Sequence, residues 1–129
     1  MSWSAKIVQI LKESKKIKNV AVFDLEGQLL SHFGELLELT PKEIGTLYKC
    51  FPRTSSHPVS SVTMDGTTYR LLQVRSDTLI AVHESDLLVC YLLAHGLILA
   101  QGSSQDPGSC IYAVTSAWDQ VELLHGLLY

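Results

Sequence analysis

Residues 105–120 read QDPGSCIYAVTSAWDQ, and this stretch has the form of a helix start. Asp106 belongs to the residue types that cap helices, and Pro107 follows at the first helical position, where a missing N–H costs nothing. The apolar residues after it recur at helical spacing. They are Ile111, Val114, Trp118 and Val121. The stretch therefore predicts an amphipathic helix that needs a surface to pack against.

Upstream of this helix the chain reads as a series of short strands. Asp65-Gly66 favours a hairpin turn, because a type I′ turn needs positive φ at both positions. Five segments around and after it have strand composition at the spacing of an antiparallel meander. They are SVTM (61–64), TTYRLLQVR (67–75), TLIAVHE (78–84), LLVCYLLA (87–94) and LILAQG (97–102).

The first part of the chain predicts two helices and a hairpin. Residues 2–14 place apolar side chains on one helical face after a possible Ser2 cap. Residues 19–34 read as two strands around a tight turn at Glu26-Gly27. Residues 39–51 begin with the Thr-Pro-x-Glu pattern of a capping box, with Thr40, Pro41 and Glu43 in the three roles.

This order of elements predicts the fold class. Two strands lie between helices, and a run of strands is followed by a final helix, which is typical of an α+β protein with an antiparallel sheet and terminal helices packed on it. A chain of 129 residues, of which 47% are hydrophobic and 18% charged, suits a single globular domain over residues 1–129.

The charges are unevenly distributed along the chain. All ten Lys and Arg residues lie at or before Arg75, whereas residues 76–129 contain six Asp and Glu residues. Because no basic stripe with interleaved aromatic residues is present, we do not expect nucleic-acid binding. One basic cluster consists of Lys12, Lys15, Lys16 and Lys18, which fits either a solvated helix end or an anionic lipid surface.

No arrangement of residues in the sequence points to catalysis. There is no glycine-rich phosphate loop and no Gly-x-Ser-x-Gly motif. The cysteines and histidines never fall at metal-ligand spacing. We therefore expect a binding protein that is not an enzyme and that has no cofactor or metal.

The cysteines and the hydropathy pattern suggest a reducing compartment. Cys50, Cys90 and Cys110 are odd in number and widely spaced, which favours reduced, mostly buried thiols. No signal-peptide pattern and no apolar run long enough to span a membrane is present. We expect a cytoplasmic protein.

Several strings, in order and at matching spacing, make the chain resemble the profilin family. They are MSW (1–3), NVAVFDLEGQLL (19–30), LTPKEIGTL (39–47), YRLLQVRSDTLIA (69–81), LILAQGSSQDPGSC (97–110) and Asp119. The resemblance covers nearly the whole chain. It implies a central antiparallel sheet with the N- and C-terminal helices on one face, and a cytoskeletal protein that binds actin monomers, proline-rich segments and phosphoinositides. We expect a monomer.

The resemblance implies a proline-rich ligand between the terminal helices, where aromatic rings stack on a polyproline II segment. Trp3 is retained, whereas Lys6, Leu30 and Gln120 stand where the family has aromatic residues. His125 and Tyr129 are candidate replacements near the end of this sequence. We therefore expect proline-rich binding to be weakened.

The resemblance also implies an actin contact through the later strands and the start of the last helix. Tyr69, Arg70 and Arg75 match this region. Leu92 lies near an expected Lys, and residues 82–86 are acidic where the family is often basic. Since a reversed charge penalises the former partner, we expect actin binding to be weak or lost.

Two further features follow from the resemblance. Lys12, Lys15, Lys16 and Lys18 are candidates for phosphoinositide binding. The family usually has a small residue where Trp118 stands. Trp118 is therefore predicted to fill space in the core against the sheet and not to stack on a ligand.

Two alternatives remain open at this point. A roadblock- or longin-like module that scaffolds small GTPases also combines a hairpin, a helix, a meander and a final helix. Alternatively, a cluster of leucines near the end forms an interface, although packing on the N-terminal helix is the favoured interpretation. These leucines are Leu123, Leu124, Leu127 and Leu128.

Overall fold

The computed structural model of the chain describes residues 2–35, 41–49, 51, 61–64 and 66–125. The helices are α1 (Trp3–Ser14), α2 (Pro41–Lys49) and α3 (Pro107–His125). The strands are β1 (Ile17–Asp24), β2 (Leu29–Phe33), β3 (Ser61–Met64), β4 (Thr67–Val74), β5 (Thr78–His83), β6 (Asp86–Leu92) and β7 (Gly96–Ser103). Each expected helix and strand is present close to its predicted position.

The strands form one antiparallel sheet in the order β2-β1-β7-β6-β5-β4-β3. Strands β3 to β7 are a meander, as the spacing predicted. The early hairpin joins it because β1 pairs with β7, with Ala21 opposite Leu99 and Val22 opposite Ile98. As a result, β7 lies in the interior of the sheet, with a partner strand on each side.

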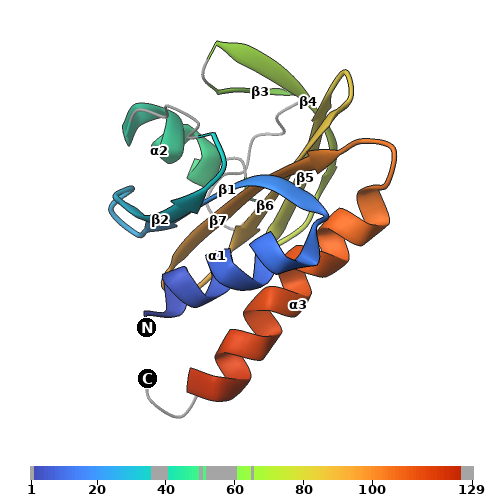
Figure 1. Cartoon of the computed structure of the whole chain (residues 1–129). Coiled ribbons are helices and arrows are strands. Elements are labelled where there is room, and N and C mark those ends of the chain that lie inside the picture. Colours follow the sequence, from blue (N-terminus) through green and yellow to red (C-terminus); the bar gives the residue numbers. More distant parts are fainter. Residues whose placement is uncertain (1, 36–40, 50, 52–60, 65, 126–129) are drawn as a thin grey trace.

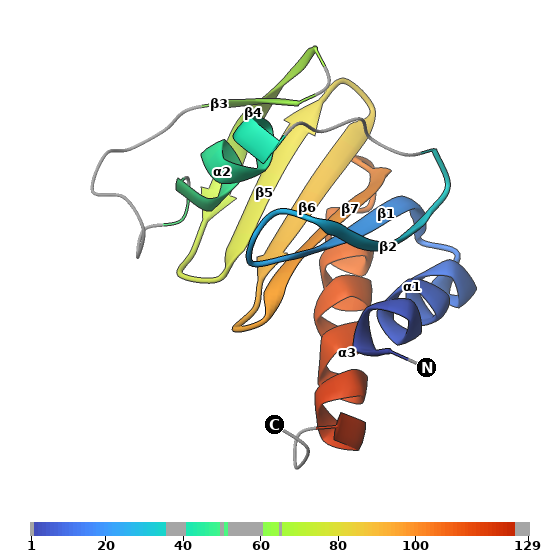
Figure 2. The same cartoon turned by 90° about the vertical axis from the view of Figure 1, so that its left-hand side faces the viewer.

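The sheet separates two apolar cores. Because side chains alternate along a strand, β7 sends Ile98 and Ala100 into the core under α1 and α3, and Leu97 and Leu99 into the core on the opposite side. α2 contributes to that second core. Figures 1 and 2 show α1 and α3 together on one face of the sheet, which confirms the predicted fold class.

The predicted helix starts and turns are present where the structure describes them. Ser2 caps α1 by accepting a hydrogen bond from the N–H of Ala5 (3.3 Å), and Asp106 caps α3 by accepting from the N–H of Ser109 (3.4 Å). Gly27, with φ of 82°, turns the first hairpin. Thr40, the predicted cap of α2, and Asp65 of the second hairpin turn lie outside the described residues.

The start of α3 packs closely against the sheet. A Cβ at Gly102 on β7 would lie 2.5 Å from the Cys110 sulfur, so only glycine allows this approach. Burial raises the pKa of the Cys110 thiol, which contacts the backbone oxygens of Lys16 and Ser103. Cys90 and Cys110 are buried, as predicted, whereas Cys50 lies outside the described residues.

The predictions for α3 are partly confirmed. Trp118 is buried (9% exposed) in the core under the helices, as expected of a space-filling residue. Leu123, by contrast, is 86% exposed, so the expectation that it packs on the N-terminal helix is wrong. It lies two residues after the buried Val121, and this turns it away from the core. The side chain of Leu124, and residues 127 and 128, lie outside the description.

Candidate partner-binding face

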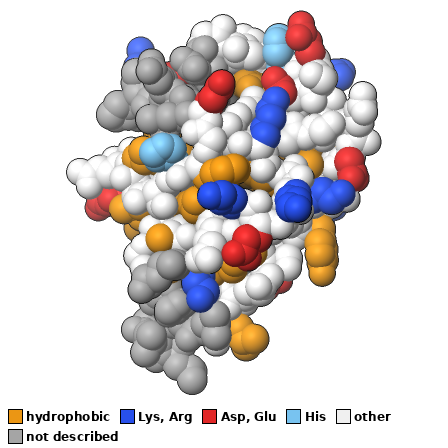
Figure 3. All heavy atoms as spheres, in the orientation of Figure 1, with side chains coloured by type: hydrophobic (Ala, Val, Ile, Leu, Met, Phe, Trp, Pro, Cys, Tyr) orange, Lys and Arg blue, Asp and Glu red, His pale blue; other side chains and the backbone are white. Residues whose placement is uncertain are grey.

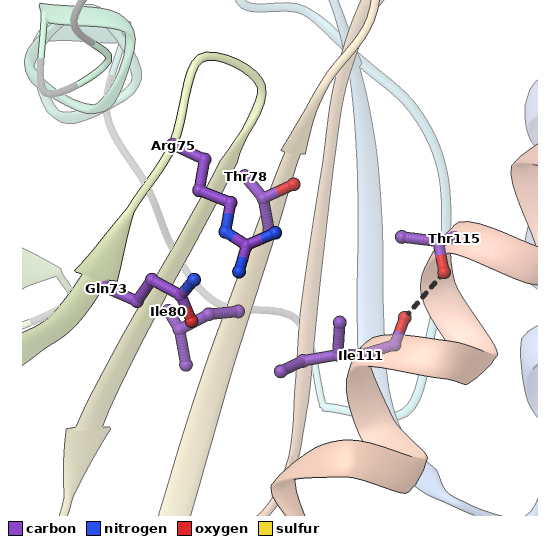
Figure 4. Close-up of a pocket in the computed structure, with 6 residues that line it drawn as sticks. All are labelled: Gln73, Arg75, Thr78, Ile80, Ile111 and Thr115. Atoms are coloured by element: carbon purple, nitrogen blue, oxygen red, sulfur yellow. Dashed lines mark hydrogen bonds between the residues drawn. The ribbon is translucent and has the colours of Figure 1, made fainter.

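A pocket of about 210 Å³ lies between β4, β5 and the first half of α3. Figure 4 shows the Arg75 side chain reaching over it from the end of β4. Two isoleucines supply apolar lining, and the remaining lining side chains are polar. The lining residues are Gln73, Arg75, Thr78, Ile80, Ile111 and Thr115. The pocket thus combines a cation with a small apolar surface.

Local backbone features place Arg75 at this position. The pairing of β4 with β5 shifts register between Leu71 and Gln73, so Leu71 packs toward the α2 side whereas Gln73 lines the pocket opposite Ile80. An irregularity of this kind redirects the side chains that follow it. The N–H of Arg75 then donates to the carbonyl of Thr78 (2.7 Å), which closes the turn between the strands.

Three carboxylates lie on the same side of the sheet as this pocket, around Tyr91 of β6. Partial burial raises the pKa of the Tyr91 hydroxyl, and the negative charges of Asp77, Asp119 and Glu122 raise it further. These three residues and Arg75 are called the acidic face below. Arg75 is the last basic residue of the sequence, so no Lys or Arg of β5, β6 or α3 offsets the carboxylates.

The side chain of Tyr69 is buried, whereas those of Arg70 and Arg75 are exposed on the other side of the sheet. Tyr69 is 4% exposed, and its hydroxyl accepts a hydrogen bond from the buried amide of Gln101 (2.9 Å) in the core on the α2 side. Arg70, the next residue of the strand, is exposed and points to the opposite side. Arg70 and Arg75 therefore present charge, whereas Tyr69 presents almost no surface.

Sequence reasoning missed several members of this face. Gln73, Thr78 and Thr115 line the pocket, and Asp77 and Glu122 join Asp119 around Tyr91. Their types are common on any surface, so no local motif marked them. The absence of basic residues after Arg75 was the signal that could have located the acidic face.

Trp3 lies at the contact between the two terminal helices. Its ring meets that of Trp118 edge to face, with centroids 6.0 Å apart and an interplanar angle of 81°, and the His95 ring lies 6.5 Å away. Leu30 of β2 is 43% exposed, and Gln120 is exposed. The His125 side chain and Tyr129, the other two candidates for a proline-rich site, lie outside the described residues.

The four lysines at the end of α1 and just after it lie in different environments. Lys16 pairs with Asp106 (3.7 Å) and Lys18 pairs with Asp86. The Lys12 ammonium is 5.5 Å from the centre of the Phe33 ring, and Lys15 ends α1 with φ of 60°. Figure 3 shows Lys and Arg side chains on this side of the molecule with Asp and Glu side chains among them. Two of the four lysines are thus already neutralised locally.

In the described part of the chain, no group of three or more His, Cys, Asp or Glu side chains is placed to hold a metal ion. Among the helices described, none combines the length and apolar character needed to cross a membrane.

A sequence model of the profilin family matches residues 1–122. The chain belongs to the profilin family. None of the curated proteins matches it. The roadblock- or longin-like alternative is not favoured, since the family match and the fold both agree with a profilin over almost the whole chain.

Solved profilins share the fold at low sequence identity. Acanthamoeba castellanii profilin II has a TM-score of 0.79 at 14% identity, and Schizosaccharomyces pombe profilin has 0.76 at 16%; each match covers 99% of this chain and 100% of that chain. LokiProfilin1, solved in complex with rabbit actin, has 0.69 at 12% identity, with 96% of this chain and 98% of that chain covered.

Proposed function

We propose that this profilin is a non-enzymatic regulator of the cytoskeleton in the cytoplasm. It acts as one domain over residues 1–129 and binds actin monomers weakly through the acidic face. The complex of LokiProfilin1 with rabbit actin supports actin as the partner. The charge of the acidic face supports a low affinity for actin. The resemblance implies basic residues that face an acidic surface of actin, and like charges across an interface lower affinity.

The test is a titration of labelled monomeric actin at low salt, together with the rate of actin polymerisation. We expect a dissociation constant weaker than about 10 μM, which corresponds to less than about 7 kcal/mol of binding free energy. Arg75→Glu should weaken it further, because it removes the cation beside the pocket. Lys42→Glu on α2, also exposed, is the control and should leave binding unchanged.

Two results would contradict this proposal in different ways. Submicromolar binding by the wild type would refute the weakened contact. An equal loss for Arg75→Glu and Lys42→Glu would mean that net charge, and not the acidic face, sets the affinity.

We propose that proline-rich segments bind weakly between α1 and α3. The edge-to-face contact with Trp118 occupies part of the Trp3 ring. Lys6, Leu30 and Gln120 supply no aromatic surface on which a polyproline II segment can stack. Titration of tryptophan fluorescence with oligoproline is therefore expected to show no saturation below about 1 mM peptide. Saturation at micromolar peptide, lost in Trp3→Phe but kept in Trp118→Phe, would refute this.

We propose that contact with phosphoinositides rests mainly on Lys12 and Lys15. Each basic residue near an anionic membrane contributes about 1 kcal/mol, but Lys16 and Lys18 already pair with Asp106 and Asp86. In vesicle cosedimentation at low salt, Lys12→Glu/Lys15→Glu should therefore lose more binding than Lys16→Glu/Lys18→Glu. Equal losses would show that only total charge matters.

A further inference from the structure

The edge of the sheet formed by β2 has few of the features that protect edge strands. In the described sheet β2 pairs with β1 alone, and Figure 2 views it from outside, in front of the other strands. Its sequence, LLSHF (29–33), contains no charged residue and no proline, which are the residues that usually blunt an edge. A register shift opposite Val22 and Phe23 leaves one extra residue near Leu30, but Ser31 to Phe33 pair regularly with β1.

Exposed leucines gather on the same hairpin. Six large hydrophobic side chains are exposed among the described residues, and three of them lie within six positions here. They are Leu25 (56%), Leu29 (40%) and Leu30 (43%). Single exposed hydrophobic residues need no explanation, but neighbouring ones beside an open strand edge mark an interaction surface.

The backbone of β2 offers hydrogen-bonding groups at this edge. The N–H of Asp24 donates to the carbonyl of Gln28, so alternate residues of β1, including Val22 and Val20, direct their backbone groups toward β2. Ser31 and Phe33 lie opposite Val22 and Val20, and they direct their own backbone N–H and C=O groups toward β1. His32 lies between these two partners, and its N–H and C=O therefore point outward, where another extended strand can pair with them.

We propose that the β2 edge pairs antiparallel with β2 of a second copy of this chain. The same patch then serves both copies around a twofold axis. Because the two strands run in opposite directions, the Leu29 end of one copy, next to the hairpin turn, lies beside the Phe33 end of the other. This inference is independent of the proposed actin contact, because β2 is no part of the acidic face.

Charge complementarity favours a second copy of this chain as the partner of the β2 edge. Glu26 is exposed in the turn at the leucine end of β2. Lys12 lies at the other end, 5.5 Å from the centre of the Phe33 ring. Antiparallel pairing directs the Glu26 end of each copy toward the Lys12 end of the other, so the charge attraction occurs twice. Glu35, also exposed, lies two residues after Phe33 at the same end of β2.

The dimer is weak, and the chain remains monomeric in dilute solution. A strand of five residues with three leucines buries less than the roughly 800 Å² per partner of a standard interface. We therefore expect a dissociation constant between about 10 μM and 1 mM.

Sedimentation equilibrium of the whole chain between about 10 μM and 1 mM tests the inference. Leu30→Lys puts a charge on the edge, and His32→Pro removes the outward N–H without removing a hydrogen bond to β1, since the backbone groups of His32 point away from β1. Each should raise the dissociation constant of the dimer at least about tenfold. Leu72→Lys is the matched control, because Leu72 is 53% exposed but lies on β4, and it should leave the constant unchanged.

Circular dichroism shows whether each variant is folded. If His32→Pro does not fold, the comparison of Leu30→Lys with Leu72→Lys tests the inference. A wild type that stays monomeric at about 1 mM would overturn the inference. So would a dimer that Leu72→Lys weakens as much as Leu30→Lys does. Neither result bears on actin binding, which the titration above measures separately.

Discussion

Trp118→Ala is expected to lower the free energy of unfolding by about 3–5 kcal/mol, the usual cost of truncating a large aromatic side chain in a core. Trp118 is 9% exposed and belongs to the core under α1 and α3. Its removal also takes away the edge-to-face contact with Trp3, which fixes α1 against α3. Chemical denaturation measures the loss, and the melting temperature should fall by more than about 10 °C.

Tyr112→Ala is the matched control for this measurement. Tyr112 is another aromatic residue of α3, but it is 73% exposed, so its truncation should change the free energy of unfolding by no more than about 0.5 kcal/mol. A loss below about 1 kcal/mol for Trp118→Ala would mean that the helices repack without the indole, and the assignment of Trp118 to the core would lose its energetic basis.

Asp119→Lys/Glu122→Lys is expected to strengthen actin binding at least about tenfold, or about 1.4 kcal/mol. Both carboxylates lie close enough to Tyr91 to affect its pKa, and no basic residue of β5, β6 or α3 offsets them. Reversing both charges makes the acidic face basic, with Asp77 as its one remaining carboxylate. The gain should shrink as salt is raised, because the side chains are exposed. The actin titration described above measures it.

Glu13→Lys/Glu26→Lys controls for net charge. It also raises the net charge by four, but both residues are exposed on α1 and the first hairpin, away from the acidic face. We expect it to change actin affinity less than twofold. If the control strengthens binding as much as the test variant does, long-range attraction explains the gain, and the acidic face is not the contact.

The elements of this fold could be predicted from sequence because their signals are local. Ser2, Asp106-Pro107 and Gly27 each act within a few residues, and the structure places helix starts or a turn at all three. The position of β1 between β2 and β7 could not be predicted in the same way. It depends on pairing between residues about eighty positions apart, for which no turn or cap gives a signal.

The candidate face was less predictable than the fold. Arg75 could be identified as the last basic residue, but its place beside a pocket depends on a register shift in β4 that the pattern of residues does not reveal. Tyr69 follows the alternation of the strand into the core, where Gln101 provides the partner for its hydroxyl. The charge of a region could therefore be predicted from the sequence, but the direction of single side chains could not.

The position of β7 determines when this chain can fold during its synthesis. β1 is made early, yet its interior neighbour is complete only when residues 96–103 have been added. α1 likewise waits for α3, the helix it packs against. Until most of the chain has been made, the early segment therefore has a hairpin whose β1 edge lacks its β7 partner, and a helix whose apolar face lacks α3. Neither the pairing of β1 with β7 nor the packing of α1 on α3 can therefore form until β7 and α3 have been made.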